Sequence, residues 1–310
     1  MSENAKSERW RWLSFPLAIG ALAWTVWLLW DSIPLVLESL PKLHWGWLGF
    51  TLVGNLIAGY LVFEAFRALF EKIQPCTYPR FHLAHLYFTG QLMKHLPGRI
   101  WGIAYQAAMG NRASMVEWVS VTSVFMVLST GFAVWVATTV LSFMFGFLWG
   151  VLALITGAAV YLLVWKERPL KYVLFILSKL PFLKRLTIAL EPFIGVDTKF
   201  KATVGFWYIG SWFFCLLAWA GYGIAWPELG AVNGILLAGL YTIAWFIGYI
   251  SLVTPSGLGV RELSFVILAQ GFPPDAVAGM LVFGRLILLL VDIFLGFSFL
   301  NTKLFIKKNR

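Results

Sequence analysis

The stretch Thr254-Pro255-Ser256-Gly257-Leu258-Gly259-Val260-Arg261-Glu262 places a proline, two glycines and two opposite charges inside long apolar sequence. An uncharged run leads into it from Leu229, and a second apolar run follows from Leu263 to Pro274. In a lipid bilayer, irregular backbone is tolerated only where it packs against other helices or lines a cavity, because its polar groups must be satisfied inside the protein. Charged residues at that depth are costly and usually functional. The stretch therefore predicts a broken helix in a membrane protein, with Arg261 and Glu262 as candidate functional residues.

The composition of the whole chain also indicates a polytopic membrane protein. Of its 310 residues, 60% are hydrophobic and 12% are charged, and the mean hydropathy is +0.80. These values are typical of repeated transmembrane helices rather than of a soluble domain. The net charge is +10, but the basic residues gather at the ends of apolar runs, so the positive-inside rule explains them and nucleic-acid binding is not indicated.

Seven apolar runs are long enough to cross a membrane as helices, which predicts an all-α fold of seven to eight transmembrane helices. One pair of helices is expected within Trp118 to Trp165, with its turn near Ser142 to Gly150. The other runs are Leu13 to Trp30, read as an uncleaved first span, and those that begin at Trp45, Ala202, Leu229 and Ala276.

The charged segments between these runs predict the topology. Residues 166–201 contain eight basic and three acidic residues, a net charge of +5, and the C-terminal tail is also basic. Both are expected on the cytoplasmic side, as is the N-terminus, because cytoplasmic loops carry an excess of Lys and Arg. The segment is either an interfacial helix on anionic lipid or a solvated connector. Residues 1–310 are expected to form one membrane domain, with repeat halves at 13–165 and 202–302.

A second interrupted segment lies between Phe81 and Asn111. Its two short uncharged runs flank Lys94-His95-Leu96-Pro97-Gly98-Arg99. Neither run can cross a hydrocarbon core of about 30 Å at about 1.5 Å per residue, so a re-entrant hairpin or a broken span is expected. Because both termini are expected inside, one of the two interrupted segments has to make a net crossing.

The two interrupted segments share a pattern, since each follows two spans and places a proline ahead of glycines. Transporters built from structural repeats have such breaks in matching positions, with the substrate site between them. Proline removes a backbone donor and ends a half-helix, and a half-helix that begins near Val260 would aim its positive end at the break. The expected structural breaks are Pro97, Pro255 and Gly102, and the glycines expected to bring the backbone close to the substrate are Gly98, Gly257 and Gly259.

Ionisable residues near the breaks are the candidate binding site. Arg99, Arg261 and Glu262 are the leading candidates for a phosphate-headgroup site, in which the acid holds the cations or takes part in proton coupling. The alternative is that the charges merely neutralise one another. The further candidates are Lys94 and Arg285 as cations and Asp292 as an anion.

Three other patterns have plainer explanations. Glu64 and Arg67 are three residues apart on one helix face and are expected to form an ion pair. His82, His85 and His95 have no nearby Cys, Asp or Glu to complete a metal site. Gly98/Gly102, Gly146/Gly150 and Gly230/Gly234 have the GxxxG spacing that favours helix packing. No catalytic motif or cofactor fingerprint occurs, so neither an enzyme nor a cofactor is expected.

Leu96-Pro97-Gly98-Arg99 with Gly102, and Pro255 to Glu262, resemble the lysylphosphatidylglycerol synthase transmembrane-region family of bacterial and archaeal membrane proteins. The resemblance covers nearly the whole chain from the second span onward. It implies a flippase of the cytoplasmic (inner) membrane that moves an aminoacylated phospholipid between leaflets. The family's synthase domain is absent from a chain that ends at Arg310, so aminoacyl transfer is not expected.

The expected function is therefore translocation of a phosphate-bearing lipid in cell-envelope biogenesis, with membrane lipid as the partner. Stand-alone relatives are associated with polysaccharide or glycolipid assembly, which leaves a polyprenyl-phosphate-linked sugar open as the cargo. Two other functions also stay open. One is a membrane-embedded enzyme or accessory acting on polyprenyl phosphate, and the other is a non-transporting partner in an envelope-synthesis complex.

Overall fold

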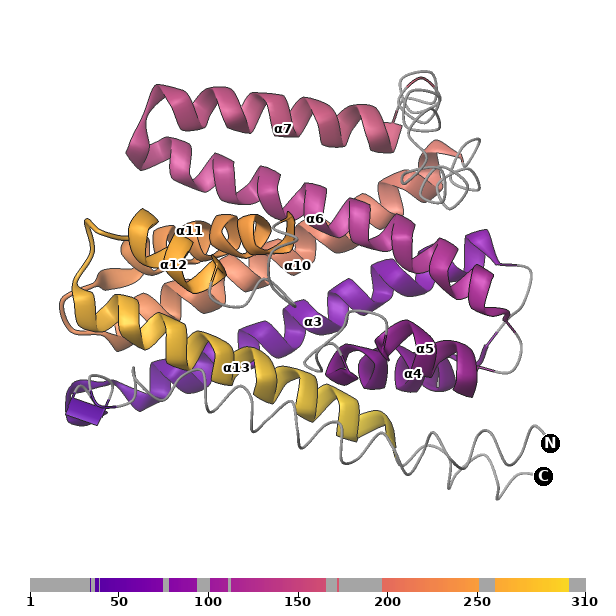
Figure 1. Cartoon of the computed structure of the whole chain (residues 1–310), viewed down its shortest axis with the longest axis horizontal. Coiled ribbons are helices and arrows are strands. Elements are labelled where there is room, and N and C mark those ends of the chain that lie inside the picture. Colours follow the sequence, from indigo (N-terminus) through magenta and orange to yellow (C-terminus); the bar gives the residue numbers. More distant parts are fainter. Residues whose placement is uncertain are drawn as a thin grey trace.

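The protein is a bundle of long helices with two helical hairpins packed into it (Figure 1). The computed structural model describes residues 34, 37–38, 40–74, 78–93, 101–110, 113–165, 172, 197–250 and 260–300, and these contain helices and no strands. The helices are η2 (Leu40–Lys42), α3 (Trp45–Ile73), α4 (Arg80–Met93), α5 (Trp101–Met109), α6 (Met115–Phe145), α7 (Phe147–Trp165), α10 (Thr198–Ala225), α11 (Gly230–Ile250), α12 (Val260–Leu268) and α13 (Pro274–Leu300).

The all-α membrane fold is confirmed in its coarse form. Five described helices, α3, α6, α10, α11 and α13, are long and apolar enough to cross a membrane, and α7 is a shorter apolar helix. The first expected span, Leu13 to Trp30, lies outside the described residues, as does most of the basic segment 166–201.

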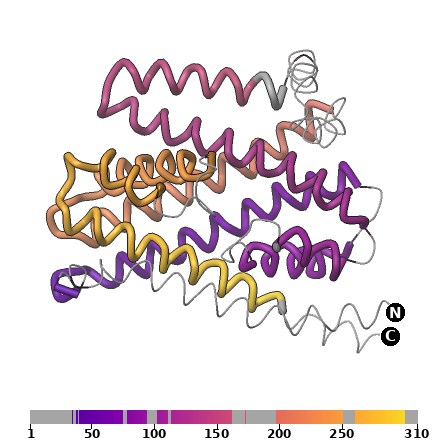
Figure 2. The backbone as a smooth tube through the Cα atoms, in the orientation of Figure 1, coloured from indigo at the N-terminus to yellow at the C-terminus, as the bar shows by residue number. Residues whose placement is uncertain are grey.

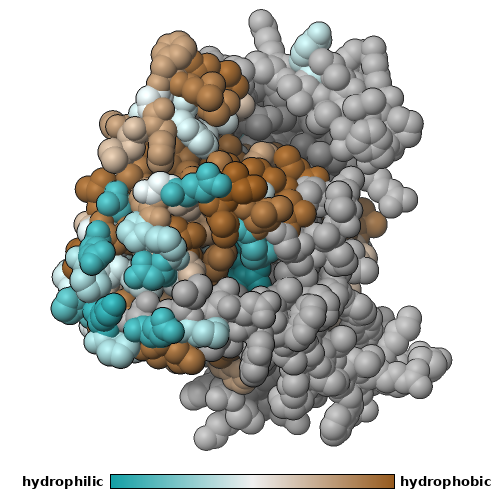
Figure 3. All heavy atoms as spheres, turned by 60° about the vertical axis from the view of Figure 1, so that its left-hand side comes forward, coloured by the Kyte–Doolittle hydropathy of each residue, from teal (hydrophilic) through white to brown (hydrophobic). Residues whose placement is uncertain are grey.

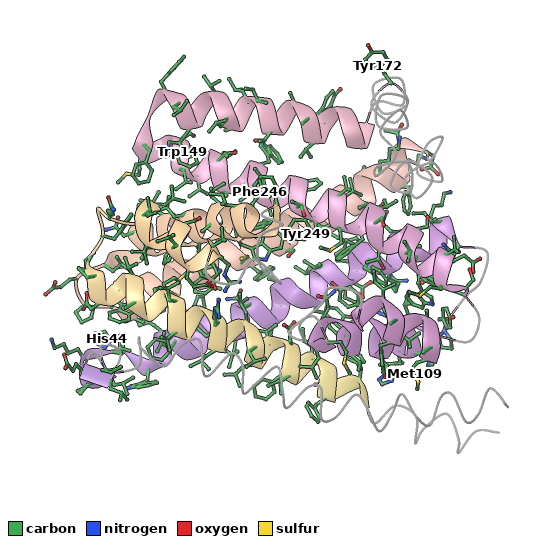
Figure 4. The ribbon with its side chains drawn as sticks, in the orientation of Figure 1. His44, Met109, Trp149, Tyr172, Phe246 and Tyr249 are labelled. Carbon is green, nitrogen blue, oxygen red and sulfur yellow. The ribbon has the colours of Figure 1, made fainter. Side chains whose placement is uncertain are left out.

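The bundle has two ends that differ in which turns they carry. The α6–α7, α10–α11 and α12–α13 turns lie at the end where α3 begins (Figures 1 and 2). The opposite end carries the last turn of α3 and the first turns of α6 and α10, and Figure 4 places His44 and Met109 at these opposite ends. α13 runs from the first end toward the second, as does α7.

Local sequence signals explain where several helices begin and end. Ser114 and Glu117 form a capping box at the start of α6, with the Glu117 carboxylate accepting from the Ser114 amide at 2.5 Å. Asp197 caps α10 by accepting from the Phe200 amide, and this bond lowers the pKa of the Asp197 carboxyl. Gly146 ends α6 with a φ of 81°, a conformation that favours glycine, which confirms the predicted turn between α6 and α7.

Small residues allow the central helices to approach closely. α3 and α10 pack where a Cβ built on Gly54 would lie 2.7 Å from Ala218 Cβ, and Ser211 donates to the Ala58 carbonyl at 3.0 Å. On α11, a Cβ at Gly234 would lie 2.6 Å from Gly223 Cα of α10. The packing role expected for Gly234 is therefore confirmed.

The same glycine spacing has a different meaning at the α6–α7 turn. Gly146 is a turn residue, and nothing lies within 4 Å of a Cβ built on Gly146 or Gly150. Helix packing was the wrong explanation for this pair, because in the described structure no neighbouring helix lies against it.

Gly234→Ala is expected to destabilise the bundle by about 1–3 kcal/mol, since the methyl group would force α10 and α11 apart. The matched control is Gly150→Ala, where the added methyl group meets open space and alanine favours the helix. Denaturation of the two variants in detergent compares them directly. Equal stability of both variants would show that the contact between Gly223 and Gly234 does not hold the helices together.

The surface of the bundle carries polar side chains at one end and apolar side chains along its flanks. Figure 3 brings forward the end where α13 begins, and hydrophilic side chains gather there beside apolar flanks. The flanks include strongly exposed apolar side chains, such as Leu154 at 76% and Phe206 at 66%. Exposed side chains of this kind fit contact with lipid, in agreement with the length of the helices.

Candidate functional site

The first interrupted segment forms two short helices, α4 and α5, on either side of its break. They run antiparallel and approach closely, because a Cβ at Gly102 would lie 2.6 Å from the Gly90 carbonyl oxygen. This contact gives Gly102 a packing role just after the break. The residues predicted at the break itself, Lys94, Pro97, Gly98 and Arg99, lie outside the described residues.

Polar side chains inside this hairpin hydrogen-bond to one another. Tyr105 Oη of α5 lies 3.2 Å from His85 Nε2 of α4, and both residues are buried. In the described part of the chain, no group of three or more His, Cys, Asp or Glu side chains could hold a metal ion. His85 of α4 therefore has a hydrogen-bond partner, Tyr105, on the neighbouring helix α5.

The second interrupted segment resumes as a helix at Val260, where the sequence predicted that a half-helix would begin. α12 packs on α11, with the Tyr241 and Phe265 rings in an edge contact at 5.3 Å. Arg261 and Glu262 lie in its first turn, where the helix dipole and free amide groups favour an anion. Pro255, Gly257 and Gly259 lie outside the described residues.

Three charged side chains meet between α11, α12 and α13, and with Tyr241 we call them the arginine cluster. Arg285 of α13 donates to Glu262 Oε1, and Arg261 Nε lies 3.3 Å from the same oxygen. Arg261 also donates from Nη2 to Tyr241 Oη at 2.5 Å, and its guanidinium lies 4.8 Å from the centre of the Tyr241 ring. One carboxylate oxygen thus accepts a hydrogen bond from Arg285 and forms an ion pair with Arg261.

The charges of the arginine cluster do not balance. Arg261 and Arg285 carry two positive charges against one negative charge on Glu262, which leaves the three side chains at +1. The Arg285 side chain is 9% exposed and that of Arg261 is 20% exposed. The Nε atoms of both arginines are buried and have no hydrogen-bond partner among the described groups. Buried donors of this kind are costly, and an added acceptor would satisfy them.

The arginine cluster lies well along α11 and α13, where the first turn of α12 meets them. Tyr241 follows the start of α11 at Gly230 by eleven residues, and Arg285 follows the start of α13 at Pro274 by eleven residues. At 1.5 Å per residue, both lie about 16 Å along their helices. No charged residue occurs between Leu229 and Val260, so the cluster meets α11 in the middle of an uncharged helix that is long and apolar enough to cross a membrane.

A second charged group joins α3 to α4. Glu64 is 2% exposed, and its Oε2 accepts from Arg67 Nε at 2.8 Å, which confirms the predicted ion pair. Arg80 of α4 donates to Glu64 Oε1 at 2.5 Å, and this bond raises the pKa of the Arg80 guanidinium. Glu64 is the first charge after nineteen uncharged residues of α3, so it lies at the far boundary of the apolar run.

Asp292 does not join the ion pairs of the arginine cluster. It lies seven residues beyond Arg285 on α13, is buried, and interacts electrostatically with Tyr87 of α4. The alternative drawn from the sequence was that four charges neutralise one another, but the described ion pairs join only three of them, Arg261, Glu262 and Arg285.

Two functional neighbours could not be found by sequence reasoning. Tyr241 lies 20 residues before Arg261 in an apolar helix, where tyrosine is common, and Arg80 lies 16 residues after Glu64 across an intervening loop. Only the packing of α11 on α12 and of α4 near α3 brings these pairs together.

The chain was compared with protein-family models, curated proteins and solved structures, and no family model, curated protein or solved structure matches it.

Proposed function

We propose that this protein is a lipid translocase that moves a phosphate-bearing lipid across the membrane. The observation that carries the proposal is the arginine cluster, in which two partly buried guanidinium groups outnumber one carboxylate well along two apolar helices. A cation at this depth is costly, and membrane proteins keep such residues mainly for substrate or ion pathways. An anionic headgroup is the ligand whose charge offsets the excess.

The chemistry of the cluster favours a phosphate over a simple halide. Guanidinium groups bind phosphate oxygens through paired N–H donors, and Arg261 and Arg285 both hold an Nε donor without a hydrogen-bond partner among the described groups. The first turn of α12 adds amide groups and the positive end of the helix dipole. The unpartnered Nε donors and the first turn of α12 both favour the oxygens of an anion.

The order of the helices supports a repeat related by inversion. α3 and α10 are 29 and 28 residues long, and each precedes a helical hairpin and then a long helix. α5 and α12, the second arms of the two hairpins, are both nine residues long. The packing is reciprocal, because α13 packs against α4 as α6 packs against α11. The proposed repeat units are therefore Trp45 to Phe145 and Thr198 to Leu300.

The two hairpins enter the proposed repeat from opposite ends of the bundle (Figure 1). α4 and α5 return the chain to the end where α6 begins, and α11 and α12 return it to the end where α13 begins. In this proposal, the expected span at residues 13–30 and helices α3, α6, α7, α10 and α13 make six crossings, so both termini lie on one side. Neither interrupted segment then makes a net crossing, which differs from the expectation drawn from the sequence, because α11 pairs with α12 as a hairpin instead of forming a separate span. Transporters with inverted repeats alternate access by moving one unit against the other around such a site.

Two lipid classes are candidates for the cargo, and both carry a phosphate ester on a lipid chain. The resemblance of the motifs favours an aminoacylated or other anionic glycerophospholipid, while envelope assembly would supply a polyprenyl-phosphate-linked sugar. Fluorescent phosphatidylglycerol, fluorescent polyprenyl phosphate and zwitterionic phosphatidylcholine separate these classes in one transport assay. We expect movement of at least one of the first two and none of phosphatidylcholine.

Arg261→Ala is expected to remove transport in proteoliposomes, because it removes one of the two guanidinium groups that would hold the phosphate. Glu262→Gln is also expected to stop transport, since the carboxylate would no longer compete for the arginines and release the lipid. Headgroup movement is measured from the accessibility of the fluorophore to an external quencher. Lys42→Ala, an exposed lysine in η2, is the matched control and should transport normally. Normal transport by folded Arg261→Ala protein would contradict the proposed site.

A further inference from the structure

Glu262 occupies the position that a bound anion would take. Its Oε1 accepts from Arg285 and lies 3.3 Å from Arg261 Nε, so a single carboxylate oxygen forms ion pairs with both guanidinium groups. The carboxylate is 25% exposed, which makes it the most accessible of the three charged side chains. The protein therefore carries its own anion at the centre of the arginine cluster.

A phosphate group matches the two arginines better than this carboxylate oxygen does. It offers several oxygens to two planar forks, whereas the two guanidinium groups converge here on one atom and leave both Nε donors without a hydrogen bond among the described groups. An arriving phosphate would therefore compete with Glu262 for both arginines. The displaced carboxylate would then lie beside a second negative charge in apolar surroundings, where two anions repel strongly.

We infer that Glu262 is an exchangeable counter-anion, displaced from Arg261 and Arg285 by the lipid phosphate and protonated as it leaves. Binding of one phosphate thus takes up one proton, which converts the Glu262 carboxylate to a carboxylic acid. Release reverses the step, because the carboxylate gives up the proton and pairs with the arginines again. The inference rests on the proposed function and adds a coupling ion to it.

The groups around Glu262 suit this exchange. Arg261 faces it from α12 itself and Arg285 from α13, while Tyr241 of α11 holds Arg261 through its hydroxyl and ring. Besides Tyr241, the described ionisable residue of α11 is Tyr249, eight residues farther along the helix, and Asp292 lies two turns farther along α13 near Tyr87. In this setting, Glu262 is the acid whose charge the incoming phosphate replaces.

The test counts protons taken up when purified protein binds dihexanoyl phosphatidylglycerol, a soluble lipid with one phosphodiester charge. Calorimetry in two buffers of different ionisation enthalpy gives the proton number, and titrations from pH 5.5 to 8 give the affinity. The wild-type protein should take up close to one proton, so its affinity should fall by up to about tenfold for each unit of rising pH. Glu262→Gln should bind more tightly, take up no proton and lose the pH dependence.

Glu228→Gln is the matched control, because Glu228 is an exposed acid in the α10–α11 turn, away from the arginine cluster. It should behave as the wild-type protein does. Proton uptake that persists in Glu262→Gln, or binding without uptake by the wild-type protein, would overturn the inference while leaving the proposed site intact. If Glu262→Gln does not fold, the wild-type proton number decides alone. Absence of any lipid binding or transport by the wild-type protein would instead overturn the proposed function.

Discussion

Arg285→Gln is expected to weaken binding of an anionic phospholipid by at least about 30-fold, which corresponds to about 2 kcal/mol or more. The substitution removes the most deeply buried cation of the arginine cluster, whose side chain is 9% exposed. Arg261 and Glu262 then remain as a neutral pair, so no excess positive charge is left to attract the headgroup. Binding of dihexanoyl phosphatidylglycerol to the purified variant measures the loss.

The same substitution separates a binding site from a structural ion network. If the three charges only held α12 against α13, removing Arg285 would strongly destabilise the bundle, because it would break a buried network. If the excess cation is kept for the ligand, its removal relieves a charge imbalance, and the free energy of unfolding should stay within about 1 kcal/mol of the wild-type value or rise. A large loss of stability with unchanged lipid affinity would assign a structural role to Arg285.

Two further variants control for charge and shape. Lys72→Gln removes one positive charge at an exposed pair with Asp197, whose charged atoms are 3.5 Å apart, and should leave lipid affinity unchanged. Arg285→Lys keeps the charge at the cluster but loses the planar fork, so it should restore only part of the affinity. If both the charge and the planar shape of Arg285 contribute to phosphate binding, lipid affinity should fall from wild type to Arg285→Lys and fall again to Arg285→Gln.

The fold could be predicted from sequence wherever a local signal determines it. The half-helix starts at Val260, and the α6–α7 turn falls at Gly146, since glycine is favoured at its φ of 81°. The Glu64–Arg67 pair follows from helical spacing alone. These features depend on residues close together in the chain, where helix geometry fixes which side chains meet.

The partners that complete each charged group could not be predicted, because they come from other helices. Nothing in the sequence near Arg261 points to Tyr241, and nothing near Glu64 points to Arg80. Likewise, charge alone suggested that Asp292 belongs with Arg285, but seven residues along a helix place them about 10 Å apart along its axis. Tertiary packing decided which charges form one group, and packing between apolar helices leaves little trace in composition.

The combined substitution Arg67→Gln with Arg80→Gln is expected to destabilise the protein by about 3–5 kcal/mol. Glu64 is 2% exposed and accepts from both arginines, one on its own helix and one on α4. Without them its carboxylate would stay buried with no cation nearby, and an uncompensated buried charge is the main cost of breaking such a pair. Reversible denaturation in mixed micelles measures the loss.

A third substitution tests whether the buried charge is the cause. Adding Glu64→Gln to the double variant removes the carboxylate, so we expect it to restore at least half of the lost stability even though one more hydrogen-bonding group has changed. Glu71→Gln is the matched control, because Glu71 also binds Arg67 but is 42% exposed, and its loss should change stability by no more than about 1 kcal/mol. If the triple variant is less stable than the double variant, Glu64 contributes through hydrogen bonds to neutral groups rather than through its charge. If it recovers, the ion pairs of Glu64 hold the first hairpin against α3 by neutralising a buried carboxylate.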